Sequence, residues 1–271
     1  MRQIQKIATP GSIAAGQTST FNLPLGPTYH RIYIELTAAT TGNTPVPVAA
    51  ADWGTFIDDI RLIVNGDTRI EWNAVDLVAF NTYNGQTPEP GVLPIFLSLP
   101  WMRTTIGEDS TAYGTASGMA SFTLELDMKT GIDIGVLEAR AVVDEPQAWG
   151  AHLRVQRFNK QFGLQGDVEV SDLPLGPYNM LGMHISSDAV DKVELLANNV
   201  KIFDTTKRLR DTHQGIIGKV PQTGYTHIEL LGENRNSEAL PMLMNDFRLT
   251  MGLTSDNVQM RLAAVSVQGV Q

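Results

Sequence analysis

Short segments in which apolar and polar residues alternate recur along the whole chain. Each predicts a β-strand with one buried and one wetter face. Helical spacing appears at two places, around Asp76-Leu77 and around Arg208-Leu209. One helical segment per half leaves no room for the strand–helix alternation of a parallel sheet. The clearest strand segments are residues 30–36, 60–64, 121–126, 136–143, 180–185, 193–197, 246–251 and 258–267.

The second half of the chain repeats the order of the first. Leu23–Pro27 and Leu173–Pro177 both read LPLGP, and each leads into an alternating segment. The next strand of each copy ends in Asn65-Gly66 or Asn198-Asn199, pairs that tolerate the positive φ of a tight hairpin turn. The spacing between copies falls from 150 residues at LPLGP to 133 at Asn65, so the first copy carries insertions in its loops.

This repeat predicts the domain organisation. Each copy has about eight short strands with turn signals at the spacing of an antiparallel sandwich, and two sheets of four make a jelly roll. We therefore predict an all-β fold of two tandem eight-stranded jelly rolls, a double jelly roll, each with one short helical excursion. The predicted boundaries are 1–146 for the first jelly roll, 147–151 for a linker and 152–271 for the second jelly roll.

Composition narrows the function classes. The 271 residues include no cysteine, which excludes disulfides, thiolate nucleophiles and sulfur-ligated zinc. Of the net charge of -9, residues 1–146 carry -8 and residues 147–271 carry -1. An acidic chain does not suit the neutralisation of phosphates, so no direct nucleic-acid binding is expected. No signal peptide or membrane-spanning segment is predicted, and the chain is interpreted as a soluble cytosolic product.

Candidate chemical groups are scattered. No two of the five histidines fall within five residues of each other, so a histidine metal site is not expected. Adjacent acidic residues are interpreted as solvated turn residues. The alternative is that these turns bind a hard cation. A basic stretch is interpreted as an amphipathic connector. The residues concerned are His30, His152, His184, His213 and His227; Asp58-Asp59, Glu108-Asp109 and Asp144-Glu145; and Arg154, Arg157 and Lys160.

Two other functions stay open from the residues alone. A carbohydrate- or receptor-binding tandem sandwich would need an exposed aromatic platform from Trp53, Trp101 or Tyr113. A glycosidase or lyase on a jelly-roll scaffold would need two carboxylates facing one cleft. The four tryptophans lie near expected loops and turns, where packing at a core edge or subunit interface is the commoner role. We predict no enzyme, name no catalytic or cofactor-binding residue, and leave the metal ligands unassigned.

Several blocks of residues resemble a known family. The blocks are Ile13-Ala14-Ala15-Gly16 leading to Leu23-Pro24 and Tyr29; Phe158-Asn159-Lys160-Gln161 through Ser171-Asp172-Leu173-Pro174; Ala189–Glu194; and Asp246-Phe247-Arg248-Leu249. Through these blocks the sequence is similar to corticovirus-type major capsid proteins, in the double jelly-roll lineage of tailless, membrane-containing icosahedral bacteriophages.

The resemblance implies a structural role in the virion. It implies a homotrimer with a pseudo-hexagonal outline that builds the shell around an internal membrane. Neighbouring capsomers, minor capsid proteins and membrane proteins of the virion would be its partners, and a vertex or other minor capsid protein is a variant of this interpretation. The family resemblance also implies calcium as a structural metal, with no required cofactor, and synthesis in the host bacterial cytoplasm.

Loop placement follows from jelly-roll topology. The connection at Asn65–Asp67 should share an end with Leu99–Ala120, whose shorter counterpart is Leu231–Leu243. By the resemblance, that end would face outward in a capsid. The insertion Thr37–Thr55 should lie at the opposite end, where we expect it to contact a neighbouring subunit or the inner membrane. A mobile exposed loop is the alternative for this insertion.

Overall fold

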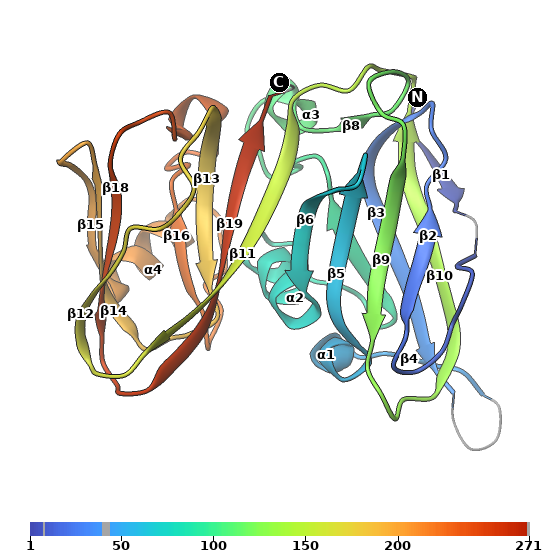
Figure 1. Ribbon diagram of the computed structural model, residues 1–271, viewed down its shortest axis with the longest axis horizontal. Coiled ribbons are helices and arrows are strands. Elements are labelled where there is room, and N and C mark those ends of the chain that lie inside the picture. The colour runs from blue at the N-terminus through green and yellow to red at the C-terminus, as the bar shows by residue number, and fades with distance from the viewer. Residues whose placement is uncertain (8, 40–43, 270–271) are drawn as a thin grey trace. The chain divides into compact units, whose positions relative to one another are not determined.

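The structure, a computed structural model, describes residues 1–7, 9–39 and 44–269. The described chain divides into two compact units (Figure 1). Unit 1 comprises Met1–Thr82 and Gln86–Gln156, and unit 2 comprises Tyr83–Gly85 and Arg157–Gly269. The boundary between Gln156 and Arg157 thus falls inside a strand that begins at His152. The division into residues 1–146, 147–151 and 152–271 stays a prediction beside these units.

The first half of the sequence forms two antiparallel sheets. In one sheet the strand order is β1-β10-β3-β7, with the short strands β4 and β8 also paired with β3. In the other the order is β6-β5-β9-β2. The elements are β1 (Gln3–Lys6), β2 (Thr18–Asn22), β3 (Thr28–Ala38), β4 (Val46–Pro47), η1 (Ala50–Asp52), α1 (Trp53–Phe56), β5 (Ile57–Val64), β6 (Asp67–Asn73), α2 (Ala74–Tyr83), β7 (Val92–Phe96), α3 (Thr105–Asp109), β8 (Tyr113–Gly114), β9 (Phe122–Met128) and β10 (Ile134–Asp144).

The second half repeats this order strand for strand. Its sheets are β11-β19-β13-β16 and β15-β14-β18-β12, so the predicted double jelly roll is confirmed (Figure 1). Such a sandwich closes a core between two four-stranded sheets. The elements are β11 (His152–Phe162), β12 (Gly166–Val170), β13 (Tyr178–Ile185), β14 (Val190–Ala197), β15 (Val200–Thr206), α4 (Lys207–Ile216), β16 (Thr226–Glu229), η2 (Asn236–Glu238), β17 (Leu240–Pro241), β18 (Phe247–Leu253) and β19 (Val258–Gln268).

Alternation along the strands builds the core of each unit. Strands β9 and β18 both alternate buried and half-buried residues over their full length. In unit 2 the buried members Leu249 and Met251 belong to one apolar cluster with Val193, Leu195 and Ile185. Each such side chain stabilises the fold by about 1.5–3 kcal/mol relative to an exposed one. With no disulfide in the chain, this burial is the main source of stability.

Both LPLGP motifs form the same local contact. The Tyr29 hydroxyl donates a hydrogen bond of 2.6 Å to the carbonyl of Pro24. The Tyr178 hydroxyl donates to the carbonyl of Pro174 in the same way. The aromatic residue that starts the next strand therefore fixes the proline-rich connection in each copy.

The two predicted hairpin turns also match. Asn65 has a φ of 52° and Asn198 a φ of 49°. The side-chain oxygen of Asn65 accepts from the N–H groups of Ala120 (2.6 Å) and Ser121 (3.1 Å). That of Asn198 accepts from Asp246 (3.2 Å) and from the residue before it (2.9 Å). Each hairpin thus lies beside the end of the long connection after β7 or β16, as the topology predicts; its outward orientation in a capsid stays a prediction.

The helices α2 and α4 occupy the same place in the two copies. The side chain of Asn81, in α2, donates to the carbonyl of Pro94 in β7 (2.8 Å). The side chain of Gln214, in α4, donates to the carbonyl of His227 in β16 (2.7 Å). Both pairs are offset by 133 residues, the spacing already seen at the hairpins. Among the described residues, no helix is long and apolar enough to cross a membrane.

The insertion Thr37–Thr55 is partly packed on unit 1. Val48 and Trp53 are buried, whereas Val46 is exposed. Val48 joins the sheet through backbone hydrogen bonds with Leu36 (3.3 Å) and Gly91 (2.7 Å). Residues 40–43 lie outside the described part, and the expected contact with a neighbour or a membrane stays a prediction.

Replacing Asn65 with glycine should test how much the hairpin side chain stabilises the fold. Glycine keeps the positive φ but removes the acceptor of two backbone N–H groups, so we expect the free energy of unfolding to fall by about 1–3 kcal/mol. Urea unfolding followed by circular dichroism measures the change. The matched control is Asn257→Gly, at a turn with the same φ of 52°. Equal losses in both variants would contradict the role given to the Asn65 oxygen.

Candidate functional site

Four of the five histidines lie on strands, and the fifth lies on a helix. His30 is on β3 and His184 on β13, as predicted for ordinary sheet residues. His152 is on β11, His227 on β16 and His213 on α4. Residues 1–7, 9–39 and 44–269 contain no group of three or more His, Cys, Asp or Glu that could hold a metal ion. No calcium ligand is therefore assigned, and structural calcium stays a prediction from the family resemblance.

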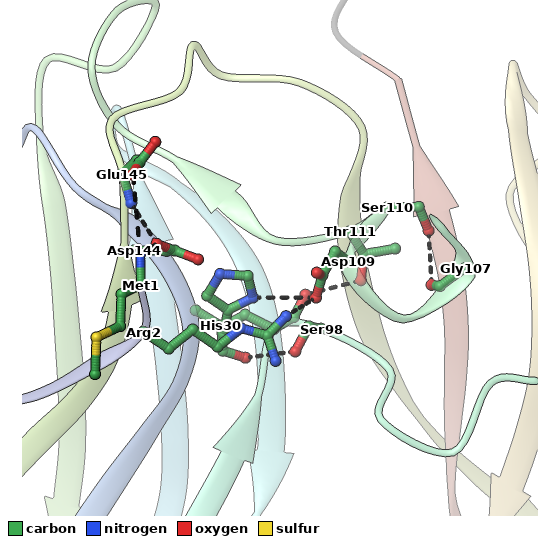
Figure 2. Close-up of polar contacts among 11 residues, drawn as sticks. Met1, Arg2, His30, Ser98, Gly107, Asp109, Ser110, Thr111, Asp144 and Glu145 are labelled. Carbon is green, nitrogen blue, oxygen red and sulfur yellow. Dashed lines mark hydrogen bonds and ion pairs between the residues drawn. The ribbon is translucent and has the colours of Figure 1, made fainter. Parts of the chain in front are cut away.

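A small polar site surrounds His30 in unit 1. Figure 2 shows the side chains of His30 and Arg2 both directed at Asp109. The His30 Nδ1 atom lies 3.4 Å from Asp109 Oδ1, and the Arg2 guanidinium donates to the same oxygen. Burial lowers the pKa of His30, and the charge of Arg2 lowers it further, while Asp109 opposes both. The site joins the first residues of the chain to α3.

The predicted acidic pairs are only partly solvated turns. Asp109 lies in α3 and is bound by Arg2, and Asp144 ends β10. The amino group of Met1 donates to Asp144 Oδ1 at 2.9 Å, and this hydrogen bond lowers the pKa of the carboxyl (Figure 2). The turn assignment is wrong for Asp58-Asp59, which lies inside strand β5. Asp58 faces solvent there and pairs with Lys129 at 2.8 Å.

A larger cluster of titratable side chains is buried in unit 2. The Nδ1 atoms of His184 and His227 are 2.8 Å apart. The ring of Tyr83 stacks on His227, with centroids 4.0 Å apart and planes inclined by 21°. Lys219 Nζ lies 3.5 Å from Glu229 Oε2, and the Tyr83 hydroxyl donates to the same oxygen at 3.4 Å. All five side chains are buried.

Burial dominates the electrostatics of this cluster. It lowers the pKa of His227 to about 3, assisted by the charges of Arg210, Lys207 and Lys219. It lowers the pKa of His184 well below its ordinary value, and the neighbouring His227 acts in the same direction. The Nδ1–Nδ1 contact needs one N–H and one lone pair, so at least one ring is neutral, and the lowered pKa of each ring favours the neutral form of both. Burial also raises the pKa of Glu229 and lowers that of Lys219.

Sequence reasoning missed this cluster because its members are far apart in the chain. Tyr83 precedes His184 by 101 residues, and only His184 was interpreted, as a sheet residue. The available signal was a His, a Lys and a Glu within 11 residues, at Lys219, His227 and Glu229, in a chain with few charges. Such spacing is common on surfaces, so it does not by itself predict burial.

The basic stretch forms a strand. Arg154, Arg157 and Lys160 all lie on β11. The Lys160 ammonium pairs with Asp172, with the shorter N–O distance at 2.5 Å, and this hydrogen bond lowers the pKa of Asp172. The stretch interpreted as an amphipathic connector is thus a strand along which polar and apolar residues alternate.

The aromatic platform required for a glycan-binding module is not formed by the predicted residues. Trp53 and Tyr113 are fully buried. Trp101 packs on Phe80, with ring centroids 5.6 Å apart, and Phe80 packs on Trp72 at 4.9 Å. The tryptophans of unit 1 thus serve packing at the core and its edge, the commoner of the two roles considered.

Comparison with known proteins agrees with this architecture. A family model described as the viral coat protein P2 N-terminal domain matches residues 4–144, and one described as the P2 C-terminal domain matches residues 152–267. The chain belongs to the viral coat protein P2 family. The predicted resemblance is confirmed, and because the related proteins are structural capsid proteins, so is the prediction that the chain is not an enzyme.

Individual relatives match over nearly the whole length. The major capsid protein P2 of Pseudoalteromonas phage PM2 is 25% identical over 271 residues, covering 94% of this chain and 93% of the relative. The crystal structure of P2 from bacteriophage PM2 matches with a TM-score of 0.88 and 22% identity, covering 100% and 98%. A chain in the atomic structure of Sulfolobus turreted icosahedral virus matches with a TM-score of 0.72 and 11% identity, covering 98% and 90%.

The buried histidine pair should make stability depend on pH. In the unfolded chain a histidine takes up a proton near pH 6.5, whereas folded His227 does so only near pH 3. Stability from the neutral ring is therefore complete above pH 6.5 and declines as the pH falls toward 3. Between pH 7 and pH 5 we expect His227 to account for a loss of about 2 kcal/mol in the free energy of unfolding.

The variant His227→Asn, which keeps a polar atom near Nδ1, should remove about that pH dependence in urea unfolding between pH 5 and 8. Glu229 acts in the opposite direction, because its raised pKa favours the folded state as the pH falls. Glu229 is present in both the variant and the wild type, so the difference between their pH profiles removes much of its contribution. His213→Asn, at an exposed position of α4, is the control and should keep the wild-type slope. An unchanged slope in His227→Asn would contradict the assignment.

Proposed function

We propose that the chain is the major capsid protein of a tailless icosahedral bacteriophage, forming homotrimeric capsomers that build the shell around an internal membrane. The observation that carries the proposal is the full-length correspondence with the major capsid protein P2 of phage PM2, in both sequence and fold. Both halves take part in that correspondence. An isolated sandwich module would match only one of them.

The duplication suits a capsomer on geometric grounds. Three copies of a two-jelly-roll chain place six similar sandwiches around one three-fold axis, which gives a pseudo-hexagonal outline. A hexagonal outline tiles a lattice, and divergence between the two halves permits different lateral contacts. The charge difference, -8 in the first 146 residues and -1 in the remainder, supplies such divergence.

Self-association and contact with neighbouring capsomers follow from this role, and the virion is then the place where the chain resides. Minor capsid proteins and membrane proteins of the virion are further proposed partners. Synthesis in the bacterial cytoplasm belongs to the same proposal, as does the absence of direct contact with nucleic acid. The acidic chain supports the last point.

Light scattering on the purified chain at micromolar concentration tests the assembly state. We expect three times the monomer mass, since a capsomer needs a symmetric trimer with an interface of standard size or larger. Electron microscopy of cells expressing the chain with the other virion components should show shells. A monomer at this concentration would contradict the major capsid role.

A further inference from the structure

Unit 2 contains three residues from the first half of the sequence, Tyr83–Gly85. The Tyr83 ring stacks on His227, lies edge-on to His184 at 5.4 Å and sits 5.6 Å below the Lys219 ammonium. Its carbonyl accepts from the N–H of Val220 at 2.8 Å. The end of α2 therefore fills a recess made by β13, β16 and the segment after α4.

The repeat assigns Tyr83 a counterpart, Ile216. After each helix a glycine has a positive φ, 74° at Gly85 and 85° at Gly218. The next N–H then bonds back to the helix, from Gln86 to the Asn81 carbonyl (2.8 Å) and from residue 219 to the residue 214 carbonyl (2.9 Å). The helices α2 and α4 have ten residues each and the same offset of 133, so their last residues correspond.

The two counterparts differ in burial. Tyr83 is fully buried, whereas Ile216 is 78% exposed. Other apolar side chains of unit 2 are exposed as well, with Leu209, on α4, at 58% and Val200, on β15, at 62%. A single exposed apolar residue is ordinary. What sets Ile216 apart is the burial of its counterpart Tyr83.

A recess equivalent to the one that holds Tyr83 exists in unit 1. Strand pairing shows the correspondence: Tyr33 pairs with Pro94 as His184 pairs with His227. In the same register, Arg31 pairs with Phe96 in unit 1 and Gly182 pairs with Glu229 in unit 2, so Phe96 is the counterpart of Glu229. Unit 1 has a hollow of about 280 Å³ at this place. Its lining includes the counterparts of five residues around Tyr83, namely Tyr33, Gln86, Thr87, Pro94 and Phe96.

The chemistry of each recess matches its residue. Around Tyr83 the recess is polar, and Glu229 accepts from the tyrosine hydroxyl. In unit 1 the corresponding positions are Pro94, Phe96 and Tyr33, which offer apolar and aromatic surface, while Arg31, Gln86, Thr87 and Glu89 also line the hollow. Isoleucine has no polar atom to satisfy and gains by burial against such surface. The two copies therefore differ in a matched way. The helix end with the polar residue Tyr83 lies in the more polar recess, and the helix end with the apolar residue Ile216 corresponds to the more apolar recess.

We propose that Ile216 of one copy inserts into the hollow at Tyr33, Pro94 and Phe96 of a second copy, as Tyr83 packs on His227 and His184 within unit 2. Ile216 is 78% exposed in its own chain, so its side chain is available for contact with another copy. A head-to-tail contact of this kind closes into a ring when the rotation fits. The basic residues of α4, Lys207 and Arg208, would then approach the acidic half of the neighbour. This inference rests on the proposed capsid function.

Cysteine cross-linking tests the contact directly, because the chain has no native cysteine. The double variant Ile216→Cys/Tyr33→Cys, treated with a short bismaleimide, should give covalent dimers and trimers on a denaturing gel and nothing larger. The matched control is Leu243→Cys/Tyr33→Cys, because Leu243 is also 78% exposed. Only monomers in the first pair, or equal cross-linking in both pairs, would overturn the inference.

A second variant separates this inference from the proposed function. Ile216→Asp should raise the concentration at which half of the protein is trimeric by about tenfold or more, since it places a charge in an apolar contact. Leu243→Asp should leave that concentration unchanged, and circular dichroism should show both variants folded. A trimeric wild type with an equally stable Ile216→Asp trimer would overturn the contact alone. A monomeric wild type would overturn the proposed function itself.

Discussion

The outer edge of a β-sheet carries backbone N–H and C=O groups that another strand can pair with, and the two jelly rolls differ in how this edge is covered. In unit 1 the edge strand β6 has a parallel partner, since Val155 of β11 pairs with Ile70. Ile70 and Trp72 are buried there. In unit 2 the equivalent strand β15 ends its sheet, and the counterparts Phe203 and Thr205 are only half-buried. The same strand thus has two environments in the two copies, paired on its outer side in one and at the end of its sheet in the other.

The buried polar cluster of unit 2 contributes less to the free energy of folding than apolar side chains of the same volume would. A buried ion pair such as Lys219–Glu229 gains little over apolar residues of the same volume, because both charges lose their hydration. The charged members are nevertheless hydrogen-bonded: Lys219 donates to Asn84 at 2.6 Å, and Glu229 also accepts from the N–H of Leu231. An unpaired polar group is costly in a buried site. These hydrogen bonds therefore favour one arrangement of Tyr83–Gly85 over arrangements that would break them. We interpret the cluster as a device for specificity within unit 2.

Local patterns were enough to predict the double jelly roll. Alternation of apolar and polar residues indicated the strands, LPLGP indicated the repeat, and the pairs at Asn65 and Asn198 indicated the hairpins. Each of these features is determined by residues that are adjacent in the sequence. Burial that depends on distant contacts was not predictable. Trp53 looked available for a partner but is covered by its own unit, and Asp58-Asp59 looked like a turn although β5 runs through it. The cluster around His227 needs five residues from α2, β13, β16 and the segment after α4, which no local pattern brings together.

Divergence after duplication explains how one chain makes two kinds of contact with one geometry. If both helices ended in the same residue and both recesses had the same lining, either helix end would fit either recess, and a chain could pair in the wrong order. Tyr83 needs an acceptor for its hydroxyl, which Glu229 supplies in unit 2, whereas the equivalent position of the unit 1 hollow is Phe96, which has no acceptor. Lys219 and Glu229 would in turn lose a partner beside isoleucine. A misplaced helix end therefore leaves buried polar groups unpaired, a penalty that discriminates more strongly than shape alone.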